Sequence, residues 1–403
     1  MHDLTGFRGL AILRPWPLRP SATPSVWLRL WRSENVGPVT FRQLLRRFGS
    51  AEAALVALPE LARRGGRDRP LAICPPAAAE RELAELGRRG GSLIAMTDPA
   101  YPAVLAEADD APPLLLVLGD TGLLASRAVA LVGARNASAN GRLLAETMAR
   151  ELGQLGWVVV SGLARGIDSA AHQGALASGT IAVLAGGLDC PYPPESEPLH
   201  RAIAERGLLV SEMPLGRVPQ ARHFPQRNRI VSGLALGTVV VEAALQSGSL
   251  ITARLAGEQG REVMAVPGSP LDPRCRGANL LIRQGATLVE GAADVAEALS
   301  GAGGRLHPVA DRTEGPSEIP NNISEPIETT IKSSLSLVEE RLGPSPVAVD
   351  ELLRQCHMSP PFLRMTLLEL ELAGRLQWHP GNRVSLLAAG ESQPAPKAVQ
   401  SPL

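Results

Sequence analysis

The stretch Val129-Ala130-Leu131-Val132-Gly133-Ala134-Arg135-Asn136-Ala137-Ser138 is an apolar run that ends in a glycine and polar side chains. Beyond it, short apolar runs alternate with segments of helical spacing. The runs are Trp157–Val160, Ile181–Leu184, Leu208–Val210, Thr238–Val241, Glu262–Val266 and Thr287–Val289. Short, fully apolar strands separated by helices are typical of a parallel sheet covered on both faces. The sequence therefore predicts an α/β fold from Ala128 onward, with a mostly parallel, doubly wound sheet.

The chain before this domain has a different pattern. Residues 1–24 predict an irregular, Pro-rich arm, and residues 25–90 predict a small helical domain. Its first two helices are separated by Asn35-Val36-Gly37-Pro38. Such a turn resembles a SAM-like or helix-hairpin-helix module, which can present backbone N–H groups to a DNA phosphate. A simple packing module fits the same pattern.

The C-terminal part begins with residues 301–333, which are rich in Gly, Pro, Ser, Asn and Glu. This composition predicts a linker that tethers the next module flexibly. Residues 335–390 show three helical segments and a short apolar ribbon, the outline of a winged-helix-like domain. The third helix, Phe362–Ala373, carries one arginine against two glutamates. We therefore expect this domain to serve protein contact or auxiliary binding rather than primary DNA capture.

The composition restricts the class of protein. The chain has 403 residues, with 40 Lys and Arg against 40 Asp and Glu, so it does not coat a polyanion non-specifically, although a local basic groove fits. No apolar run is long enough to span a membrane. The four cysteines form no CxxC pair, which predicts free thiols in a reducing cytosol and no metal site.

One interval is locally basic. Between Glu212 and Glu242 there is no acidic side chain, and the segment within it reads Arg222-His223-Phe224-Pro225-Gln226-Arg227-Asn228-Arg229. Guanidinium groups beside a ring and two amides can hold phosphates while a base stacks. A solvated, Arg-rich helix start is the alternative interpretation.

The loops that follow the predicted strands converge on one edge of the sheet, where ligands of such folds bind. Gly133 would let the backbone approach a ligand, and the loop Ser161-Gly162-Leu163-Ala164-Arg165 would bind an anion, with Asp168 as a helix N-cap. Small residues that can donate hydrogen bonds follow the predicted strand Thr238–Val241, and an asparagine lies at the start of a later predicted helix. These residues are Ser247, Gly248, Ser249, Thr252 and Asn279. An ordinary N-cap at Ser249 would explain one of them.

Groups for catalysis are few. The sequence contains no GxGxxG fingerprint and no P-loop, and His172 and His200 are predicted on separate helices. We therefore expect binding rather than catalysis, with no cofactor and no metal.

Several long motifs occur in order: Val-Gly-Ala-Arg at 132–135, Ser-Gly-Leu-Ala-Arg-Gly-Ile-Asp at 161–168, Phe-Pro-Gln-Arg-Asn-Arg-Ile-Val-Ser-Gly-Leu at 224–234, Ser-Gly-Ser-Leu-Ile-Thr-Ala at 247–253 and Gly-Ala-Asn-Leu-Leu-Ile-Arg-Gln-Gly-Ala at 277–286. Together with Val-Pro-Gly at 266–268, they closely resemble the bacterial DprA/Smf family.

The resemblance spans about residues 95–300 and implies an extended Rossmann-like domain there. It also implies a cytoplasmic, homodimeric protein that is not an enzyme. It would bind single-stranded DNA, protect it during natural transformation and load the RecA recombinase onto it. Phe224 would stack on a base, and Arg222 and Arg227 would hold phosphates. The full set of expected DNA-binding residues is Gly133, Arg135, Ser161, Gly162, Arg165, Arg222, Phe224, Arg227, Asn228, Ser247, Gly248, Ser249 and Asn279. Some members carry a lysine where this chain has Ala221, so Arg222 is expected to replace it.

Two enzyme classes compete with this interpretation. Rossmann-like phosphoribohydrolases use a Pro-Gly-Gly-x-Gly-Thr loop followed by a glutamate, and this chain has Val241-Glu242-Ala243 without that loop. Dinucleotide-dependent oxidoreductases need an acidic residue at the second strand end, where Ser161 stands here.

Overall fold

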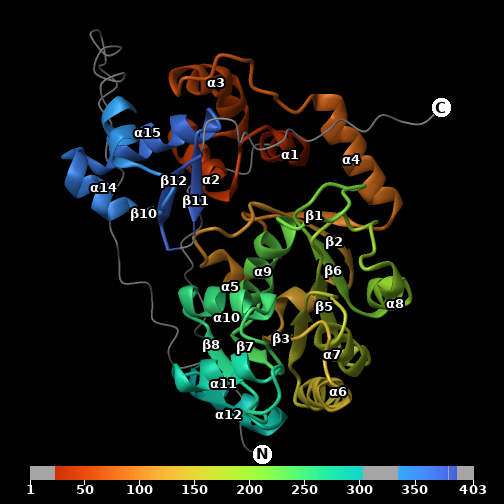
Figure 1. The fold of residues 1–403 in the computed structure, drawn as a ribbon. Helices are drawn as coiled ribbons and strands as arrows, with labels where there is room; N and C mark the ends of the chain where they lie inside the picture. Colours follow the sequence, from red (N-terminus) through yellow and green to blue (C-terminus); the bar gives the residue numbers. More distant parts are fainter. Residues whose placement is uncertain (1–22, 303–334, 380, 388–403) are drawn as a thin grey trace, which may run out of the picture.

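The computed structural model describes residues 23–302, 335–379 and 381–387 (Figure 1). Within these residues, nine strands form one sheet in the order β1-β2-β6-β5-β4-β3-β7-β8-β9. The strands are β1 (Ser92–Ala95), β2 (Leu114–Gly119), β3 (Ala128–Val132), β4 (Val158–Ser161), β5 (Thr180–Val183), β6 (Leu208–Ser211), β7 (Gly237–Val240), β8 (Glu262–Ala265) and β9 (Thr287–Leu288).

Strand direction confirms the predicted mostly parallel sheet. Every neighbouring pair from β6 to β9 is parallel, whereas β1 and β2 add antiparallel at one edge. The sequence analysis did not identify β1 and β2. The predicted arm at 1–24 and the predicted linker at 301–333 lie almost entirely outside the described residues.

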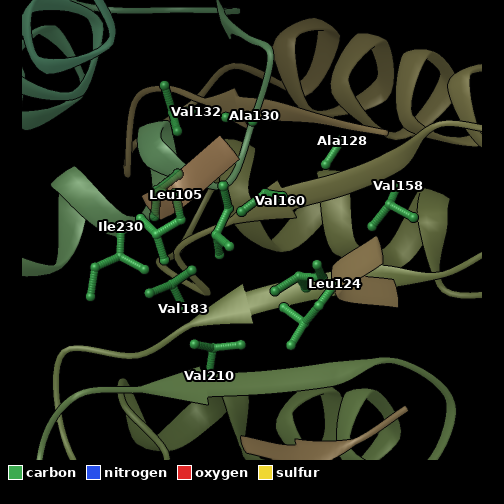
Figure 2. Packing of buried hydrophobic residues seen from close by; sticks show 14 of the residues in the cluster. Leu105, Leu124, Ala128, Ala130, Val132, Val158, Val160, Val183, Val210 and Ile230 are labelled. Atoms are coloured by element: carbon green, nitrogen blue, oxygen red, sulfur yellow. The ribbon is translucent and has the colours of Figure 1, made fainter. Parts of the chain in front are cut away.

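Helices cover both faces of the sheet, as a doubly wound fold requires. Side chains of β3 alternate between the faces: Ala130 and Val132 join the cluster shown in Figure 2, and Val129 and Leu131 join the opposite one. The cluster of Figure 2 packs under α5 (Ala103–Ala106), α9 (His223–Gly233), α10 (Gly248–Glu258) and α11 (Arg276–Arg283). The other face carries α6 (Ala139–Gln154), α7 (Ile167–Ala175), α8 (Glu197–Arg206) and α12 (Ala292–Ala302).

The order of the strands reverses beside β3. The chain runs from β3 through β4, β5 and β6, and then returns to pair β7 with the other side of β3. The loops after β3 and β7 therefore diverge at the carboxyl edge, which creates the crevice where open α/β sheets bind ligands. A ligand site is therefore expected in this crevice.

The N-terminal domain is helical, as predicted. Its helices are α1 (Pro24–Arg32), α2 (Pro38–Phe48), α3 (Ala51–Arg64) and α4 (Pro76–Arg88). The predicted turn between α1 and α2 is present, with Asn35 in a left-handed conformation (φ 59°) and Pro38 as the first residue of α2. Phe41 is fully buried in the core of this domain and contacts the rings of Trp27 and Trp31.

The C-terminal domain has the predicted winged-helix outline. Residues 335–341 are helical, and a small sheet has the strand order β10-β12-β11. The other elements are β10 (Val347–Ala348), α14 (Val349–Cys356), α15 (Pro360–Leu372), β11 (Leu376–His379) and β12 (Arg383–Leu386).

The winged helix is docked on the N-terminal domain, which corrects the expectation of a flexibly tethered module (Figure 1). Leu368 and Leu372 of α15 lie in the same apolar cluster as Phe41, whereas Leu363 and Leu367 lie in the core of the winged helix. α15 is thus apolar on two faces. It corresponds to the recognition helix of DNA-binding winged helices, and here it is used for contact within the chain.

Candidate nucleic-acid interface

Phe224 lies at the start of α9, between a guanidinium and a second ring. Cζ of Arg135 is 4.9 Å from the centroid of the Phe224 ring. The centroid of the Tyr192 ring is 5.6 Å from that of Phe224, with an interplanar angle of 53°. Arg135 comes from the loop after β3 and Tyr192 from the loop after β5. We call these residues the Arg135–Phe224–Tyr192 cluster; its groups are those that hold a phosphate beside an unpaired base.

Tyr192 was missed as a site residue. The sequence analysis kept to the Gly, Ser, Asn and Arg residues of the strand-end loops. The side chain of Tyr192 is 44% exposed, and it lies against a predicted site residue. A tyrosine shortly after a predicted strand end, in a chain with 3% aromatic residues, was the available signal.

Arg165 reaches the surface but already has an acidic partner. Its guanidinium forms an ion pair with the carboxylate of Glu195, and the two side chains are 64% and 52% exposed. Glu195 follows Tyr192 in the same loop. An exposed pair of this kind is weak and is readily displaced by another anion. Arg165 is therefore available to a phosphate that can compete with Glu195.

The α9 and α10 helices place further predicted residues near one another. Arg222, just before α9, is exposed, and Asn228 Nδ2 is 3.4 Å from the carbonyl oxygen of Gly248. The N-cap of α10 is Ser247 rather than Ser249, because the Ser247 hydroxyl accepts from the Ser249 N–H at 3.4 Å. Gly248 is exposed at the first position of α10.

Arg227 does not lie at the surface, which corrects its predicted phosphate contact. Only 4% of its surface is exposed, and its Nη1 donates to the carbonyl of Val183 at 2.5 Å. Burial lowers the pKa of Arg227 to about 10, so the group stays protonated at neutral pH. A Cβ on Gly162 would lie 2.0 Å from Nη1 of Arg227. Gly162 is thus required by packing against this guanidinium.

The loop after β4 already binds a carboxylate of its own chain, which corrects the predicted anion site. The buried Asp168 side chain accepts the N–H groups of Gly162 at 3.2 Å and Ala164 at 3.4 Å. Asp168 therefore caps the loop rather than α7, whose N-cap residue is Gly166. Ser161 is also structural, since its buried hydroxyl donates to the carbonyl of Leu131 at 2.6 Å.

The carboxylate of Glu242, which follows β7, lies at the start of α6, the helix that follows β3. This carboxylate accepts the backbone N–H of Ser138 at 2.9 Å and the hydroxyl of the same residue, which is the N-cap of α6. A Cβ on Gly141 would lie 2.5 Å from the Glu242 carboxyl carbon. At Gly133, a Cβ would lie 2.5 Å from Cγ1 of Ile167, so this glycine serves close packing rather than the predicted approach of a ligand. A nucleotide phosphate would have to displace Glu242 from this helix start.

Asn279 is structural as well. Its Nδ2 donates to the carbonyl of Gly268 at 2.9 Å, and its Oδ1 accepts the N–H of the same residue at 3.1 Å. The amide thereby fixes the turn that follows β8. This double hydrogen bond uses the side-chain groups that were predicted to meet DNA.

The histidines lie on different helices, as predicted. Burial lowers the pKa of His172 on α7 to about 3, and its Nδ1 is 2.7 Å from the Thr180 hydroxyl. His200 on α8 contacts the carbonyl of Leu188. Among the residues that the structure describes, no group of three or more His, Cys, Asp or Glu side chains could hold a metal ion. In the same residues, no helix has the length and apolarity needed to cross a bilayer.

Comparison with known proteins agrees with this architecture throughout the chain. The family described as DNA recombination-mediator protein A matches residues 92–300, a DprA-like N-terminal HHH domain matches 22–84, and a DprA winged helix domain matches 334–382. Protein Smf of Escherichia coli is 39% identical over 322 residues, covering 78% of this chain and 83% of Smf. DprA of Bacillus subtilis is 44% identical over 222 residues, covering 54% of this chain and 75% of that protein.

A solved structure gives the same result. The X-ray structure of DNA processing protein A from Streptococcus pneumoniae superimposes with a TM-score of 0.59 at 35% identity, covering 68% of this chain and 98% of that one. The family models therefore agree with the domain order over all three domains, and the solved structure agrees with the fold over the 68% of the chain that it covers. The chain belongs to the DprA/Smf family of DNA-processing proteins.

Proposed function

We propose that this protein binds single-stranded DNA at the carboxyl edge of its sheet and protects incoming strands during natural transformation. The observation that carries the proposal is the Arg135–Phe224–Tyr192 cluster, in which a guanidinium and two rings lie side by side at an accessible edge. Arg222 and Arg165 would add phosphate contacts beside it. Membership of a family of DNA-processing proteins supports the same function.

Ring stacking explains why the strand should be single. In a duplex, the faces of the bases are covered by their neighbours, so an aromatic side chain gains access at the cost of unstacking. Stacking on an unpaired base contributes about 1–3 kcal/mol and accepts any base, because every base has a π face. We therefore expect weak sequence preference.

Binding without turnover is part of the proposal. The glutamate that a phosphoribohydrolase would use corresponds to Glu242, whose carboxylate is engaged by Ser138 at the start of α6. Incubation with nucleoside monophosphates should release no ribose phosphate. Release that Glu242→Gln abolishes would favour the enzyme instead.

Loading of RecA and assembly into a homodimer belong to the same proposal, and family membership supports them. The protein should accelerate RecA filament formation on single strands coated with single-strand binding protein, as measured by the ATPase of RecA. Light scattering should give twice the 42.4 kDa chain mass. A monomer, or unchanged RecA activity, would contradict these parts without affecting DNA binding.

The main test is fluorescence anisotropy with labelled oligo-dT over a series of salt concentrations. Affinity should fall with salt, with a slope of about 0.7 per phosphate contact in a log–log plot. A duplex of equal length should bind more weakly. A flat salt response, or equal affinity for duplex and single strand, would contradict the proposal.

A further inference from the structure

A cavity of about 330 Å³ lies between the N-terminal domain and the winged helix. One wall is formed by Glu34 and Asn35, which precede α2, and by residues 66–69, which follow α3. The other wall is formed by residues 373–375, which follow α15. α15 itself packs on α2 and α3 (Figure 1). No lining residue belongs to the Rossmann-like domain, so the cavity is separate from the proposed DNA edge.

Polar groups of each domain contact the other domain at this cavity. Nδ2 of Asn35 donates to the carbonyl of Leu372 at 3.1 Å. A Cβ on Gly66 would lie 3.1 Å from Nη1 of Arg375, and the φ of Gly66 is 85°. A side chain is disfavoured at that φ, so the backbone there leaves room for the guanidinium. The two walls therefore come together only while the winged helix is docked.

Arg67 places a buried guanidinium beside the cavity. Its side chain is 6% exposed, its Nη2 donates to the Glu34 carboxylate at 2.7 Å and its Nε donates to the carbonyl of Arg69 at 3.1 Å. In the described part of the chain, Nη1 of Arg67 has no hydrogen-bond partner. It lies 3.8 Å from the position that a Cβ on Gly374 would take, on the opposite wall. A buried donor without an acceptor in the chain indicates that a further group belongs there.

Two more guanidinium groups line the cavity and are only partly engaged. Nη2 of Arg69 is 3.5 Å from a Glu34 oxygen, and the side chain of Arg69 is 61% exposed. The side chain of Arg375 is 46% exposed and forms an ion pair with Glu339 through Nη1. Each contact uses one nitrogen of a group that carries five N–H donors. The remaining donors are available to a ligand.

The charges around the cavity favour a compact anion. Three guanidinium groups line it against the carboxylates of Glu34 and Asp68, and Glu339 lies beside Arg375. Guanidinium groups bind phosphate oxygens through pairs of N–H groups. An extended polyanion would also meet the three carboxylates, which repel it, whereas a small anion can contact the arginines alone. The volume is at the lower end of the range for small-molecule sites.

We infer that this cavity binds the phosphate or diphosphate group of a small molecule, and that the bound ligand fastens the winged helix to the N-terminal domain. Arg67 and Arg69 would hold the anion from one wall, and Arg375 would hold it from the other. Because the walls meet only in the docked state, the ligand binds that state alone. Binding therefore shifts the docking equilibrium towards the docked state.

The experiment uses the full-length protein and inorganic pyrophosphate as the probe. Isothermal titration calorimetry measures its affinity, with and without an excess of oligo-dT. Hydrogen exchange of α15 amides measures docking. The variants are Arg69→Gln and Arg375→Gln. The matched control is Arg354→Gln, which removes an exposed arginine of α14 that pairs with Glu351 outside the cavity.

Wild type and Arg354→Gln should bind pyrophosphate equally, and saturation should slow hydrogen exchange in α15. Arg69→Gln and Arg375→Gln should each weaken binding by about 10- to 100-fold, the range for one lost hydrogen bond to a charged group. In these two variants, the same concentration of pyrophosphate should no longer slow exchange in α15. Circular dichroism establishes that each variant is folded.

Three outcomes would overturn the inference. The first is a wild type that gives no heat of binding with pyrophosphate. The second is wild-type affinity for pyrophosphate in a folded Arg375→Gln variant. The third is loss of pyrophosphate binding when oligo-dT is added, because the anion would then occupy the DNA site. Pyrophosphate binding that Arg375→Gln weakens supports the inference even if oligo-dT does not bind, so it is tested separately from the proposed function.

Discussion

The guanidinium of Arg229 forms a buried ion pair with the carboxylate of Glu212. Arg229 belongs to the basic segment of the sequence, and Glu212 is the acidic residue at which that segment begins. Nη1 of Arg229 also donates to the carbonyl of Asp110. Trp31 and Arg32 of α1 donate to the carbonyl of Glu212 at 3.4 Å and 2.9 Å. The pair thus joins α9 to the N-terminal domain instead of facing DNA.

Arg229→Ala should lower stability without changing DNA affinity. Removing one partner of a buried ion pair leaves the other charge without compensation, which costs roughly 3–5 kcal/mol. Arg222→Ala is the matched control, since Arg222 is exposed and is proposed to contact phosphate. Denaturant unfolding should show reduced stability for Arg229→Ala but not for Arg222→Ala. Titration with oligo-dT should show weaker binding for Arg222→Ala but not for Arg229→Ala. A stable Arg229→Ala variant with weakened DNA binding would contradict this assignment.

Gly162→Ala should disturb Arg227. The added Cβ would lie 2.0–2.5 Å from the guanidinium atoms of Arg227, which is itself fixed on the carbonyl of Val183. Overpacking of this kind costs about 1–3 kcal/mol. Gly248→Ala is the control, because a Cβ there would meet nothing within 4 Å. Thermal unfolding measures the difference in stability between Gly162→Ala and Gly248→Ala. Equal melting temperatures of the two variants would show that Arg227 can move to make room for the added Cβ.

Glu195→Gln should tighten binding of single strands at low salt. The ion pair of Arg165 with Glu195 must open before a phosphate can take its place, and the substitution removes that competition. The gain should be small, because both side chains are exposed and screened. Glu197→Gln, which breaks the exposed pair of Glu197 with Arg201, is the control. Equal gains from both variants would indicate a general charge effect and exclude a role for Arg165.

Docking of the winged helix should depend on pH through Glu371 of α15. Burial raises the pKa of this carboxyl from 4.5 to about 7, although hydrogen bonds from the Thr40 hydroxyl and Trp378 Nε1 act in the opposite direction. In the folded protein the group therefore keeps its proton to higher pH than in the unfolded chain. The contribution of protonated Glu371 to the free energy of unfolding is complete below pH 4.5. This contribution falls by at most about 3 kcal/mol as pH rises towards 7.

The comparison of wild type with Glu371→Gln isolates this contribution. The two proteins should unfold at similar temperatures near pH 5, and the variant should be more stable near pH 8. Hydrogen exchange of α15 amides measures docking directly. A constant difference between the proteins at both pH values would show that Glu371 does not titrate in this range.

Truncation after residue 300 should leave most DNA affinity and reduce stability. The Arg135–Phe224–Tyr192 cluster lies wholly in the Rossmann-like domain, so the loss of affinity should stay below tenfold, about 1.4 kcal/mol. The fragment would expose the apolar surface of α2 and α3 that Leu368 and Leu372 cover. Size-exclusion chromatography should therefore reveal association of the fragment beyond the proposed dimer, which Leu372→Asp in the full chain should partly reproduce. A fully stable fragment that does not associate beyond the dimer would contradict the docked arrangement.

The sequence by itself determined the layers of this protein and the order of its domains. Short, fully apolar strands, helices with one apolar face and Gly-Pro turns are local signals, and each acts over a few residues. The parallel sheet, the helical N-terminal domain and the winged helix could be predicted for this reason. The resemblance also placed Arg135 and Phe224 in one expected set of DNA-binding residues, and the fold brings the two side chains into contact.

Tertiary structure decided which charged side chains face solvent. Arg222, Arg227 and Arg229 are close neighbours in sequence, yet the first is exposed and the other two are buried, because the carbonyl of Val183 and the carboxylate of Glu212 engage Arg227 and Arg229. The carboxylates that occupy the predicted anion loops come from this chain itself. Glu242, which binds Ser138, is distant in sequence, whereas Asp168 lies only a few residues after the loop that it caps. The edge strands β1 and β2 and the docking of α15 depend likewise on long-range pairing. Spacing along the chain does not encode such contacts, since the fold creates them.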